Sequence, residues 1–316
     1  MNTINTILGA GGSIGNALTY VLLDNAQKVR LVSRSKIEIE GTESFKADIM
    51  DFQQTLEAVQ NSDVVYLVAG LKYDYNVWKE AWPKIINNVI EACKKSKSKL
   101  IFLDNVYMYG KVNGKMTELT PYNPCSKKGE IRAKIATQLE NEFNRGNVQG
   151  IIARAADFYG PFATKSSVPF VLAVENMLKG KKAKWLLDAN IKHSYLYIID
   201  CANGLYLLSN HDEAVNQIWH LPTKNPGITG KNFIELIAKE LGVEPHYTII
   251  KKWMVKVGGL LDSTLKELYE MLYQYEIEYY FDSSKFEKHF NFVPTSYENG
   301  IKEMIKSLRK VVENKN

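Results

Sequence analysis

The sequence has little cysteine and no long apolar run. Its three cysteines, Cys93, Cys125 and Cys201, lie far apart and show neither disulfide pairing nor metal-ligand spacing. We therefore predict that the protein binds no metal and works in a reducing compartment, the cytosol. No stretch reaches the ~18 apolar residues that a bilayer-spanning helix needs. The first residues lack the basic start and cleavage site of a secretion signal, so we expect a cytoplasmic protein with no membrane partner.

The sequence also lacks a concentrated block of positive charge. Lysine and arginine number 40 against 35 acidic residues, and the resulting net charge of +5 is spread along the chain. The densest run, between Lys94 and Lys99, is typical of a solvated helix end, so no nucleic-acid partner is expected. With 45% apolar and 24% charged residues, the composition is that of an ordinary globular protein.

Apolar runs and helical patterns alternate through the first half of the chain. This alternation predicts strand–helix–strand units, and therefore an α/β fold with a Rossmann-type doubly wound parallel sheet. The expected strands are 4–8, 29–32, 45–47, 64–69, 100–103 and 150–153, and the expected helices are 16–23, 52–60, 77–94 and 127–143.

The second half of the chain is less regular and mixes short strands with helices. The expected strands are 185–187, 195–198, 218–221 and 247–249, and the expected helices are 169–179, 202–208, 232–241, 263–275 and 297–310. We predict an NAD(P)-binding Rossmann domain over residues 1–165 and a smaller α+β substrate lobe over residues 166–316. No linker-like segment separates them, so the lobes are expected to pack closely, with room for exchange of a strand or helix.

Three evenly spaced glycines follow the first expected strand and open the first expected helix. Gly9, Gly12 and Gly15 match the tight turn, the close pyrophosphate approach and the helix–strand packing of a dinucleotide site. The backbone amides of Ser13 and Ile14 would face the phosphates, assisted by the helix dipole. A nucleotide-hydrolase loop is disfavoured, because no Lys-Ser or Lys-Thr pair follows the glycines. A plain glycine-rich turn is the alternative to a dinucleotide site.

The end of the second strand lacks the acidic residue that typically binds the ribose hydroxyls of NAD. Ser33 and Arg34 occupy this place, and the first carboxylate after them is Glu38. A guanidinium can bind a 2′-phosphate bidentately and stack beside adenine, while the serine hydroxyl adds a hydrogen bond. The sequence therefore favours NADP over NAD; the alternative for Arg34 is a surface arginine at a strand end.

Two further strand ends supply candidate contacts to the cofactor. Asp48 and Ile49 follow the third strand, where they could bracket the adenine ring, although Asp48 could equally cap the next helix. Ala69, Gly70 and Leu71 follow the fourth strand, where small residues permit close approach of ribose and phosphates or form a generic turn. We predict that all five residues lie in the cofactor site.

Four segments beyond the glycine loop complete a family resemblance. Residues 154–161 are similar to an Arg-x-x-Asn-x-Tyr-Gly-Pro motif, and residues 193–200 to an Arg-Asp-Phe-x-His-Val-x-Asp motif. Residues 281–285 and the pair Pro294-Thr295 are similar to closing Asp-x-Ser-Lys and Pro-Thr elements. Together they resemble the NAD(P)-dependent epimerase/dehydratase family of extended short-chain dehydrogenase/reductases, over nearly the whole chain.

The resemblance implies an oxidoreductase that acts on a small molecule, such as a sugar or a nucleotide sugar. His193 stands where this family often has an arginine near the substrate's phosphate, and a neutral imidazole is a weaker phosphate ligand than a guanidinium. Many relatives form homodimers through two long helices, which correspond here to residues 77–94 and 127–143. A homodimer is therefore expected from the resemblance.

The usual catalytic pair of the family is missing. Relatives carry Ser or Thr after the fifth strand and Tyr-x-x-x-Lys on the next long helix, where the tyrosine moves the proton while the nicotinamide moves the hydride. The resemblance puts Asn105 at the hydroxyl position, Glu130 at the tyrosine position and Lys134 at the lysine position. Lys134 is thus expected to bind the nicotinamide-ribose hydroxyls.

Three functions are possible for a chain that lacks the usual Ser/Thr and Tyr catalytic pair. In the first, Glu130 is a general acid or Tyr107 (or Tyr109) supplies the phenol, while Asn105 orients the substrate. Glu130 and Lys134 would otherwise be only a surface pair one helical turn apart. In the second, the protein binds NADP without turnover, as a redox sensor or an assembly partner. In the third, water or the substrate provides the proton.

Overall fold

The structure is a computed structural model that describes residues 4–164 and 167–313. The chain divides into two compact units, each assembled from three segments. The first unit comprises Met1–Met108, Lys127–Ala155 and Cys201–Trp219, and the second comprises Tyr109–Ser126, Ala156–Asp200 and His220–Asn316. The units thus alternate along the chain, whereas the sequence predicted one boundary between residues 165 and 166.

The first unit is built around a seven-stranded sheet with the order β12-β7-β5-β4-β1-β2-β3. Its strands are β1 (Ile4–Leu8), β2 (Lys28–Ser33), β3 (Thr42–Lys46), β4 (Val64–Leu67), β5 (Lys99–Asp104), β7 (Gly150–Arg154) and β12 (Gln217–His220). Each neighbouring pair from β3 across to β7 is parallel. The predicted Rossmann-type parallel sheet is therefore confirmed.

One row of residues across the sheet explains why these segments form strands. Leu31, Ile7, Tyr66, Ile101 and Ile151 lie in register on neighbouring strands, and all five are buried. A parallel sheet is covered on both faces, so its strands are continuous apolar runs and do not alternate with polar residues. The apolar runs in the first half of the sequence have this origin.

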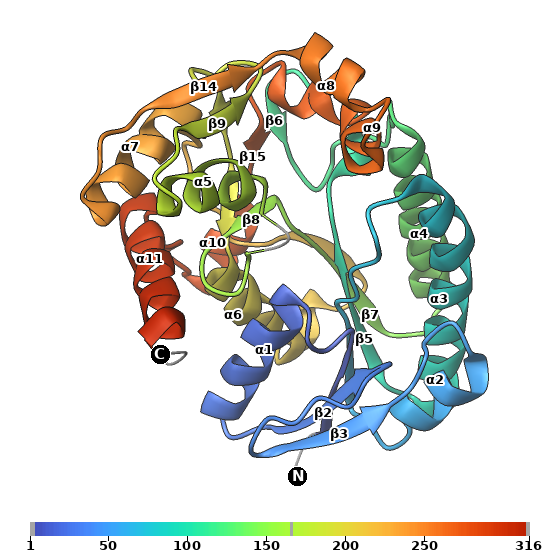
Figure 1. Cartoon of the computed structure of the whole chain (residues 1–316). Helices are drawn as coiled ribbons and strands as arrows, with labels where there is room; N and C mark the ends of the chain where they lie inside the picture. The colour runs from blue at the N-terminus through green and yellow to red at the C-terminus, as the bar shows by residue number, and fades with distance from the viewer. Residues whose placement is uncertain (1–3, 165–166, 314–316) are drawn as a thin grey trace. The chain divides into compact units, whose positions relative to one another are not determined.

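Helices cover both faces of the sheet. They are α1 (Ser13–Asp24), α2 (Phe52–Val59), α3 (Tyr75–Ser96), α4 (Lys127–Asn144) and α6 (Ile198–Ser209). Figure 1 shows α1 and α6 on one side of the sheet and α2, α3 and α4 on the other. Carboxylates cap two of them: Asp51 accepts a hydrogen bond from the Gln54 amide at the start of α2, and Asp74 caps α3 in the same way.

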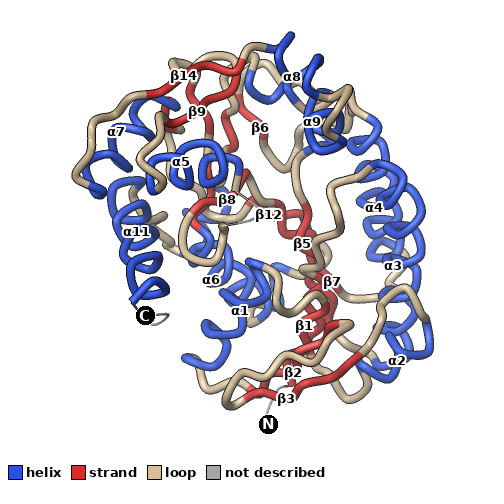
Figure 2. Tube along the Cα trace, viewed as in Figure 1, coloured by secondary structure: helices blue, strands red, loops and turns tan. Residues whose placement is uncertain are grey.

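The second unit combines short strand pairs with helices. The strand pairs are β6 (Lys115–Met116) with β15 (Tyr280–Phe281), β8 (Asp157–Tyr159) with β11 (Tyr195–Tyr197), β9 (Ala183–Leu186) with β14 (Tyr247–Ile250), and β10 (Lys192–His193) with β13 (Ile228–Thr229). Figure 2 shows β9 and β14 side by side. The helices are α5 (Glu175–Leu178), α7 (Gly230–Leu241), α8 (Lys252–Gly258), α9 (Ser263–Tyr269), α10 (Ser284–Phe290) and α11 (Tyr297–Glu313).

Aromatic side chains form the centre of the second unit. Tyr159, Trp185, Tyr195, Phe233 and Tyr297 are buried in one cluster. The Phe233 ring lies edge-on to Tyr159 at 5.8 Å and to Tyr195 at 5.4 Å, which is the favoured arrangement for aromatic pairs. This cluster is the hydrophobic core of the unit and supports the short strands around it.

Two helices expected in the second half differ from the prediction. The expected helix 169–179 is a π-type turn followed by the short α5. The expected helix 263–275 ends at Tyr269 and continues as a 3₁₀ turn at Leu272–Tyr275. Leu272 and Tyr275 are both buried, and side chains three residues apart align in a 3₁₀ turn. Core packing therefore overrode the α-helical periodicity of this segment.

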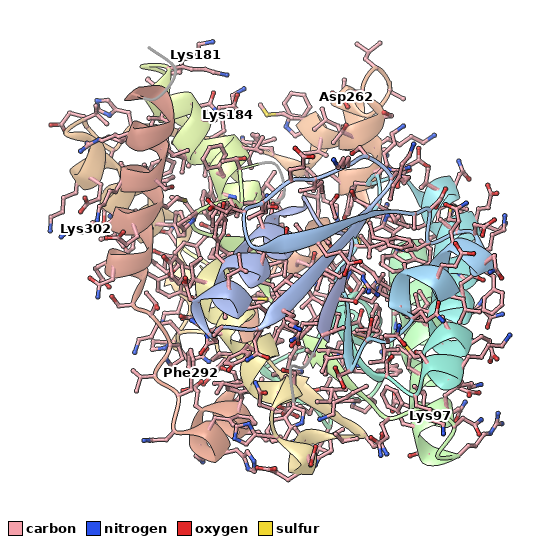
Figure 3. The ribbon with its side chains drawn as sticks, turned by 90° about the horizontal axis from the view of Figure 1, so that it is seen from below. Lys97, Lys181, Lys184, Asp262, Phe292 and Lys302 are labelled. Atoms are coloured by element: carbon pink, nitrogen blue, oxygen red, sulfur yellow. The ribbon has the colours of Figure 1, made fainter. Side chains whose placement is uncertain are left out.

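Lysine side chains extend outward from the surface of each unit. Figure 3 shows Lys97 at the end of α3 in the first unit, and Lys181, Lys184 and Lys302 in the second, all pointing away from the ribbon. No helix within residues 4–164 and 167–313 is both long and apolar enough to cross a bilayer.

Candidate functional site

The first unit has a cavity at the carboxyl edge of its sheet, where the strand order reverses. The chain continues from β1 to β2 on one side and returns to β4 on the other, and ligands of such sheets bind at this switch point. The cavity has a volume of about 510 Å³, within the range of about 300–1,000 Å³ typical of small-molecule sites. Its lining consists of residues 9–12, 32–35, 37, 47–50, 69–71 and 85.

The glycine loop forms one wall of the cavity. Gly9 has a φ of +98°, and a Cβ atom there would lie 2.6 Å from the backbone nitrogen of Ala69. A Cβ atom at Gly15 would lie 2.9 Å from the carbonyl oxygen of Gly9. Both approaches are closer than real side chains allow, so only glycine lets β1, β4 and α1 converge.

The start of α1 is suited to an anion. Ser13 is the first residue of α1, Ile14 the second, and Gly12 is the N-cap, which makes no side-chain hydrogen bond. A glycine cap has no side chain that could satisfy the amides of the first turn, and the helix dipole is positive there. Gly12 itself lines the cavity. The loop therefore has the geometry that a phosphate group requires.

The structure brings Ser33 and Arg34 to the cavity, as predicted for the end of β2. The Ser33 hydroxyl donates to the Ser35 carbonyl oxygen, and the Arg34 side chain is exposed. Lys36, two residues further on, forms an ion pair with Glu38. Arg34 is therefore the positively charged residue that lines the cavity at the end of β2.

Five further predicted cofactor residues line the cavity, namely Asp48, Ile49, Ala69, Gly70 and Leu71, whereas Ser13, Ile14, Gly15 and Lys134 are not part of its lining. The Asp48 carboxylate accepts a hydrogen bond from the Met50 amide at 3.0 Å, which closes a local turn. The alternative role of Asp48 as the cap of the next helix is wrong, because Asp51 caps α2.

Asn105 and Tyr107 follow β5 and form a tight turn. The Asn105 side-chain oxygen accepts the Tyr107 backbone amide at 3.0 Å, so the amide nitrogen of Asn105 is the group that can face a ligand. The Tyr107 ring is stacked on Trp78 at 6.2 Å. Tyr109, the other phenol considered, belongs to the second unit, and its hydroxyl pairs with His220 Nε2 at 2.8 Å.

Glu130 and Lys134 both lie on the exposed side of α4. No ion pair joins them within the part of the chain that the structure describes. The buried side of α4 consists of other residues. Their catalytic and ribose-binding roles stay predictions, and their exposure adds no support.

Sequence reasoning did not place the charged residues Lys128 and Arg132 on the buried side of α4. These two residues are also four positions apart, but each stands two positions before its counterpart in the pair Glu130 and Lys134. Two positions correspond to a rotation of about 200° around the helix axis, so the two pairs lie on nearly opposite sides of α4. The signal was available: the apolar residues that follow on the same face, such as Ile135 and Leu139, continue the helical spacing from Lys128 and Arg132.

Arg132 belongs to a buried charge cluster at the end of β5. Its Nε and Nη2 atoms lie 2.7 Å and 2.5 Å from Asp104 Oδ1, and the Asn105 backbone amide donates to the same oxygen at 2.9 Å. Arg154 Nε lies 3.7 Å from Asp104 Oδ2. Two guanidinium groups therefore lie beside one buried carboxylate.

In the second unit, His193 is held by a carboxylate and an aromatic stack. Its Nε2 lies 3.0 Å from Asp157 Oδ2, and the Tyr275 hydroxyl donates to the same oxygen at 3.3 Å. The Tyr279 ring is parallel to the imidazole at 4.1 Å. No group of three or more His, Cys, Asp or Glu side chains in the described chain could hold a metal ion.

Comparison with known proteins identifies relatives of this arrangement. Residues 6–221 match the model of the NAD dependent epimerase/dehydratase family. No curated protein sequence matches the chain significantly.

Several solved structures are similar over almost the whole chain. A dTDP-glucose 4,6-dehydratase from Bacillus anthracis str. Ames in complex with NAD has a TM-score of 0.80 at 17% identity, with 98% of each chain covered. A UDP-glucose 4-epimerase from Thermus thermophilus in complex with NAD has a TM-score of 0.79 at 18% identity, covering 97% of this chain and 99% of that one. A UDP-glucuronic acid 4-epimerase from Bacillus cereus has a TM-score of 0.78 at 18% identity, covering 98% and 100%. These likenesses agree with the Rossmann-type fold. The family model spans more than half of the sequence, and it shows that the chain belongs to the NAD dependent epimerase/dehydratase family.

Proposed function

We propose that the protein binds a pyridine dinucleotide in the cavity of the first unit. The observation that carries this proposal is the convergence of Gly9, Gly15 and Ala69 beside a cavity of about 510 Å³ at the switch point of the sheet. The glycine-capped start of α1 offers main-chain NH groups to the pyrophosphate. Similar structures contain NAD, which supports the proposal. When bound, the nicotinamide ring supplies or accepts hydride.

We propose NADP as the preferred cofactor. Arg34 and Ser33 line the cavity at the end of β2, where an NAD-selective site places a carboxylate. The Arg34 guanidinium would bind the 2′-phosphate through two charge-assisted hydrogen bonds. Asp48 belongs to a different strand end and is engaged with the Met50 amide, so it does not take the place of that carboxylate.

The proposed activity is that of an oxidoreductase on a small molecule, a sugar or a related carbonyl or hydroxyl compound. The similar structures are of enzymes whose names specify nucleotide sugars. In this chain, the Asn105 amide would orient the substrate, and Tyr107 and Glu130 are the candidates that the sequence offers for proton transfer. The Asp157 carboxylate beside His193 disfavours a diphosphate at that position, since like charges repel.

A nucleotide-binding sensor or assembly protein without turnover is the second candidate. The exposure of Glu130 and Lys134 favours it, because no acid–base pair of the usual kind faces the sheet in the described part of α4. The buried Cys93 and Cys201 and the exposed Cys125 are all free thiols, which fits a reducing cytoplasm for either function. We also carry over from the family a homodimer formed through α3 and α4, which light scattering would test.

Calorimetric titration tests the proposed function. NADPH and NADP⁺ are expected to bind more tightly than NADH and NAD⁺, and saturating NADPH should raise the melting temperature, since a ligand of the folded state stabilises it. Absence of heat and of any thermal shift with all four nucleotides would refute dinucleotide binding. NADPH oxidation with a panel of aldehydes, ketones and nucleotide sugars then separates the two candidates: turnover establishes the enzyme, and its absence favours the sensor.

A further inference from the structure

An apolar surface patch lies on α8 and on the turn that follows it, in the second unit. We call it the α8 patch, and it consists of the exposed side chains of Trp253, Met254, Val257, Leu260 and Leu261. The exposed fraction is 59% for Trp253, 83% for Leu260 and 97% for Leu261. Scattered apolar side chains are normal on a protein surface, whereas a contiguous group of large ones typically marks a binding surface.

Helical geometry places these side chains on one side of α8. Their positions follow the spacing i, i+1, i+4, i+7 and i+8 that forms one face of a helix. Val255 lies on the opposite side, where it is buried in a core cluster with Leu186 and Leu272. The helix therefore has two apolar sides: one belongs to the core of the second unit, and the α8 patch faces outward.

The turn after α8 is held firmly and extends the outward face. The amides of Leu261 and Asp262 both donate to the Gly258 carbonyl oxygen, at 3.0 Å and 2.9 Å. A Cβ atom at Gly259 would lie 3.0 Å from the Lys266 Cα atom, so glycine permits the close packing of α8 on α9 (Figure 1). Amides that are paired within the turn enter an apolar phase at a lower cost than unpaired ones.

Lysine side chains accompany the α8 patch. Three exposed lysines stand in or directly before α8: Lys251, Lys252 and Lys256. The first two directly precede Trp253, and the third lies one helical turn before Leu260. The segment 251–261 contains no acidic residue. The patch thus combines large apolar side chains with positive charge.

The acidic residues near the patch are engaged or partly covered. Glu276 forms an ion pair with Lys252 at 2.6 Å. The Asp262 carboxylate caps α9, where it accepts hydrogen bonds from two backbone amides. Glu267 and Glu270 are only partly exposed. A surface that complements the α8 patch is therefore apolar and negatively charged.

We infer that the α8 patch docks the protein on the surface of a bilayer that contains anionic phospholipids. The apolar side chains enter the region of the headgroups and upper acyl chains, while the lysine ammonium groups bind lipid phosphates. Tryptophan is enriched at this depth, because its ring is apolar and its NH group can still form hydrogen bonds. Lysine suits the same position, since its stem is apolar and its charge reaches water.

The form of the patch favours lipid over a folded protein as the partner. Leu260 and Leu261 project almost completely from the turn. A folded partner would need a closely matching hollow for each projecting side chain, because the centres of protein interfaces are packed as densely as protein interiors. Fluid lipid rearranges around the side chains without such a match. The lysines also complement the negative surface potential of an anionic bilayer.

Surface binding of this kind requires neither a spanning helix nor a secretion signal. The expectation of no membrane partner rested on the absence of these two features, so it concerned insertion across a bilayer. The inference is also independent of cofactor binding, because no residue of the α8 patch lines the cavity of the first unit.

Vesicle flotation with the full-length protein tests this docking. Wild type should bind vesicles of phosphatidylcholine mixed with phosphatidylserine, more weakly bind vesicles of phosphatidylcholine alone, and lose binding at high salt. The double variant Leu260→Ser/Leu261→Ser should bind the mixed vesicles about tenfold more weakly or less, because it removes two apolar side chains from the lipid. Its melting temperature should stay that of wild type, since both leucines are exposed.

Two matched controls separate the patch from general surface properties. Leu119→Ser replaces another leucine of the second unit that is 92% exposed, and it should leave vesicle binding unchanged. Lys251→Gln/Lys256→Gln should reduce the preference for phosphatidylserine. Lys181→Gln/Lys302→Gln, at the outward lysines of Figure 3, removes the same charge elsewhere on this unit and should have little effect.

Wild type that stays unbound with both kinds of vesicle would overturn the inference. The α8 patch would then belong to a protein interface, and a second copy as the partner would appear as self-association that Leu260→Ser/Leu261→Ser abolishes. Equal vesicle binding by wild type and this folded double variant would overturn it as well. NADPH titration of the same variants keeps the proposed function separate, because cofactor binding should be the same in all of them.

Discussion

The proposed preference for NADP depends on single side chains at the edge of the cavity. A 2′-phosphate differs from a 2′-hydroxyl by its negative charge, so discrimination requires a cation at the end of β2. Arg34 lines the cavity there, while the neighbouring Lys36 is paired with Glu38. The energetic difference between NADP and NAD should therefore be concentrated in Arg34.

Arg34→Ala is expected to weaken NADPH binding by about 10- to 100-fold, as charge-assisted hydrogen bonds are worth about 1.5–3 kcal/mol. NADH binding should change by less than about threefold, since NADH has no 2′-phosphate. Fluorescence titration with both nucleotides measures the losses, and Lys36→Ala is the control with a small effect on both. Equal losses for NADPH and NADH would contradict the assignment of Arg34.

A second single residue makes the stability of the protein depend on pH. The Asp200 carboxylate is buried and accepts hydrogen bonds from the Thr295 amide at 2.7 Å and from its hydroxyl at 2.9 Å. Burial raises the pKa of Asp200 from 3.8 to about 6, in spite of these hydrogen bonds. Between these two values the native protein holds a proton that the unfolded chain has released.

Protonated Asp200 therefore contributes stability that is complete below about pH 4 and is lost as the pH rises through about 6, on the order of 3 kcal/mol in total. In Asp200→Asn this loss should be absent, so the variant gains stability relative to wild type between about pH 4 and about pH 7.5. Urea unfolding at about pH 4 and at about pH 7.5 measures the difference in free energy of unfolding between Asp200→Asn and wild type at each pH. A constant difference would show that Asp200 titrates normally in the folded protein.

At the scale of elements, close packing of a helix on a strand constrains the sequence of the second unit. Gly300 lies in α11, and a Cβ atom there would press on the Tyr159 hydroxyl and lie 2.7 Å from its Cε2 atom. Tyr159 belongs to β8 and to the aromatic core, so it has little room to move. The absence of a side chain at Gly300 thus permits the close approach of α11 to β8, although glycine has a low helix propensity.

Gly300→Ala should lower the free energy of unfolding by about 1–3 kcal/mol, because overpacking outweighs the ~1 kcal/mol that alanine gains over glycine in a helix. Asn299→Ala, at the preceding exposed position of α11, is the matched control and should be neutral or slightly stabilising. Chemical denaturation compares both with wild type. A stabilised Gly300→Ala would mean that Tyr159 yields to the added methyl group.

At the scale of the whole molecule, both compact units are assembled from separated segments. The sheet of the first unit is completed by β12, and α6 lies against one of its faces, although both follow residue 165. Without them, the edge of β7 and an apolar face of the sheet would be exposed to water. An uncovered edge strand promotes aggregation, so the unit should depend on its last segment.

A fragment of residues 1–165, the domain expected from the sequence, should therefore lack a cooperative thermal transition when it is expressed alone. Co-expression with the complementary fragment 166–316 should restore soluble protein that binds NADPH, because it returns α6 and β12 to the sheet. Circular dichroism melting and co-purification measure the two outcomes. A fragment 1–165 that melts cooperatively by itself would support the simple boundary instead.

The amino-acid sequence by itself determined the sheet and the position of the cavity that we propose as the cofactor site. Buried parallel strands require apolar runs, and the contacts of Gly9 and Gly15 require glycine, so both features are local in the sequence. Residues at the ends of β1 to β4 could be identified for the same reason: in a parallel sheet the carboxyl ends of the strands meet at one edge.

Only the tertiary structure decided which side of α4 is buried and which segments share a unit. Glu130–Lys134 and Lys128–Arg132 have the same spacing, and a spacing alone does not specify which face turns toward the sheet. That choice depends on contacts with residues distant in the sequence, such as Asp104 on β5 and Trp82 on α3. The return of β12 to the sheet depends likewise on hydrogen bonds between distant segments, which no local pattern encodes.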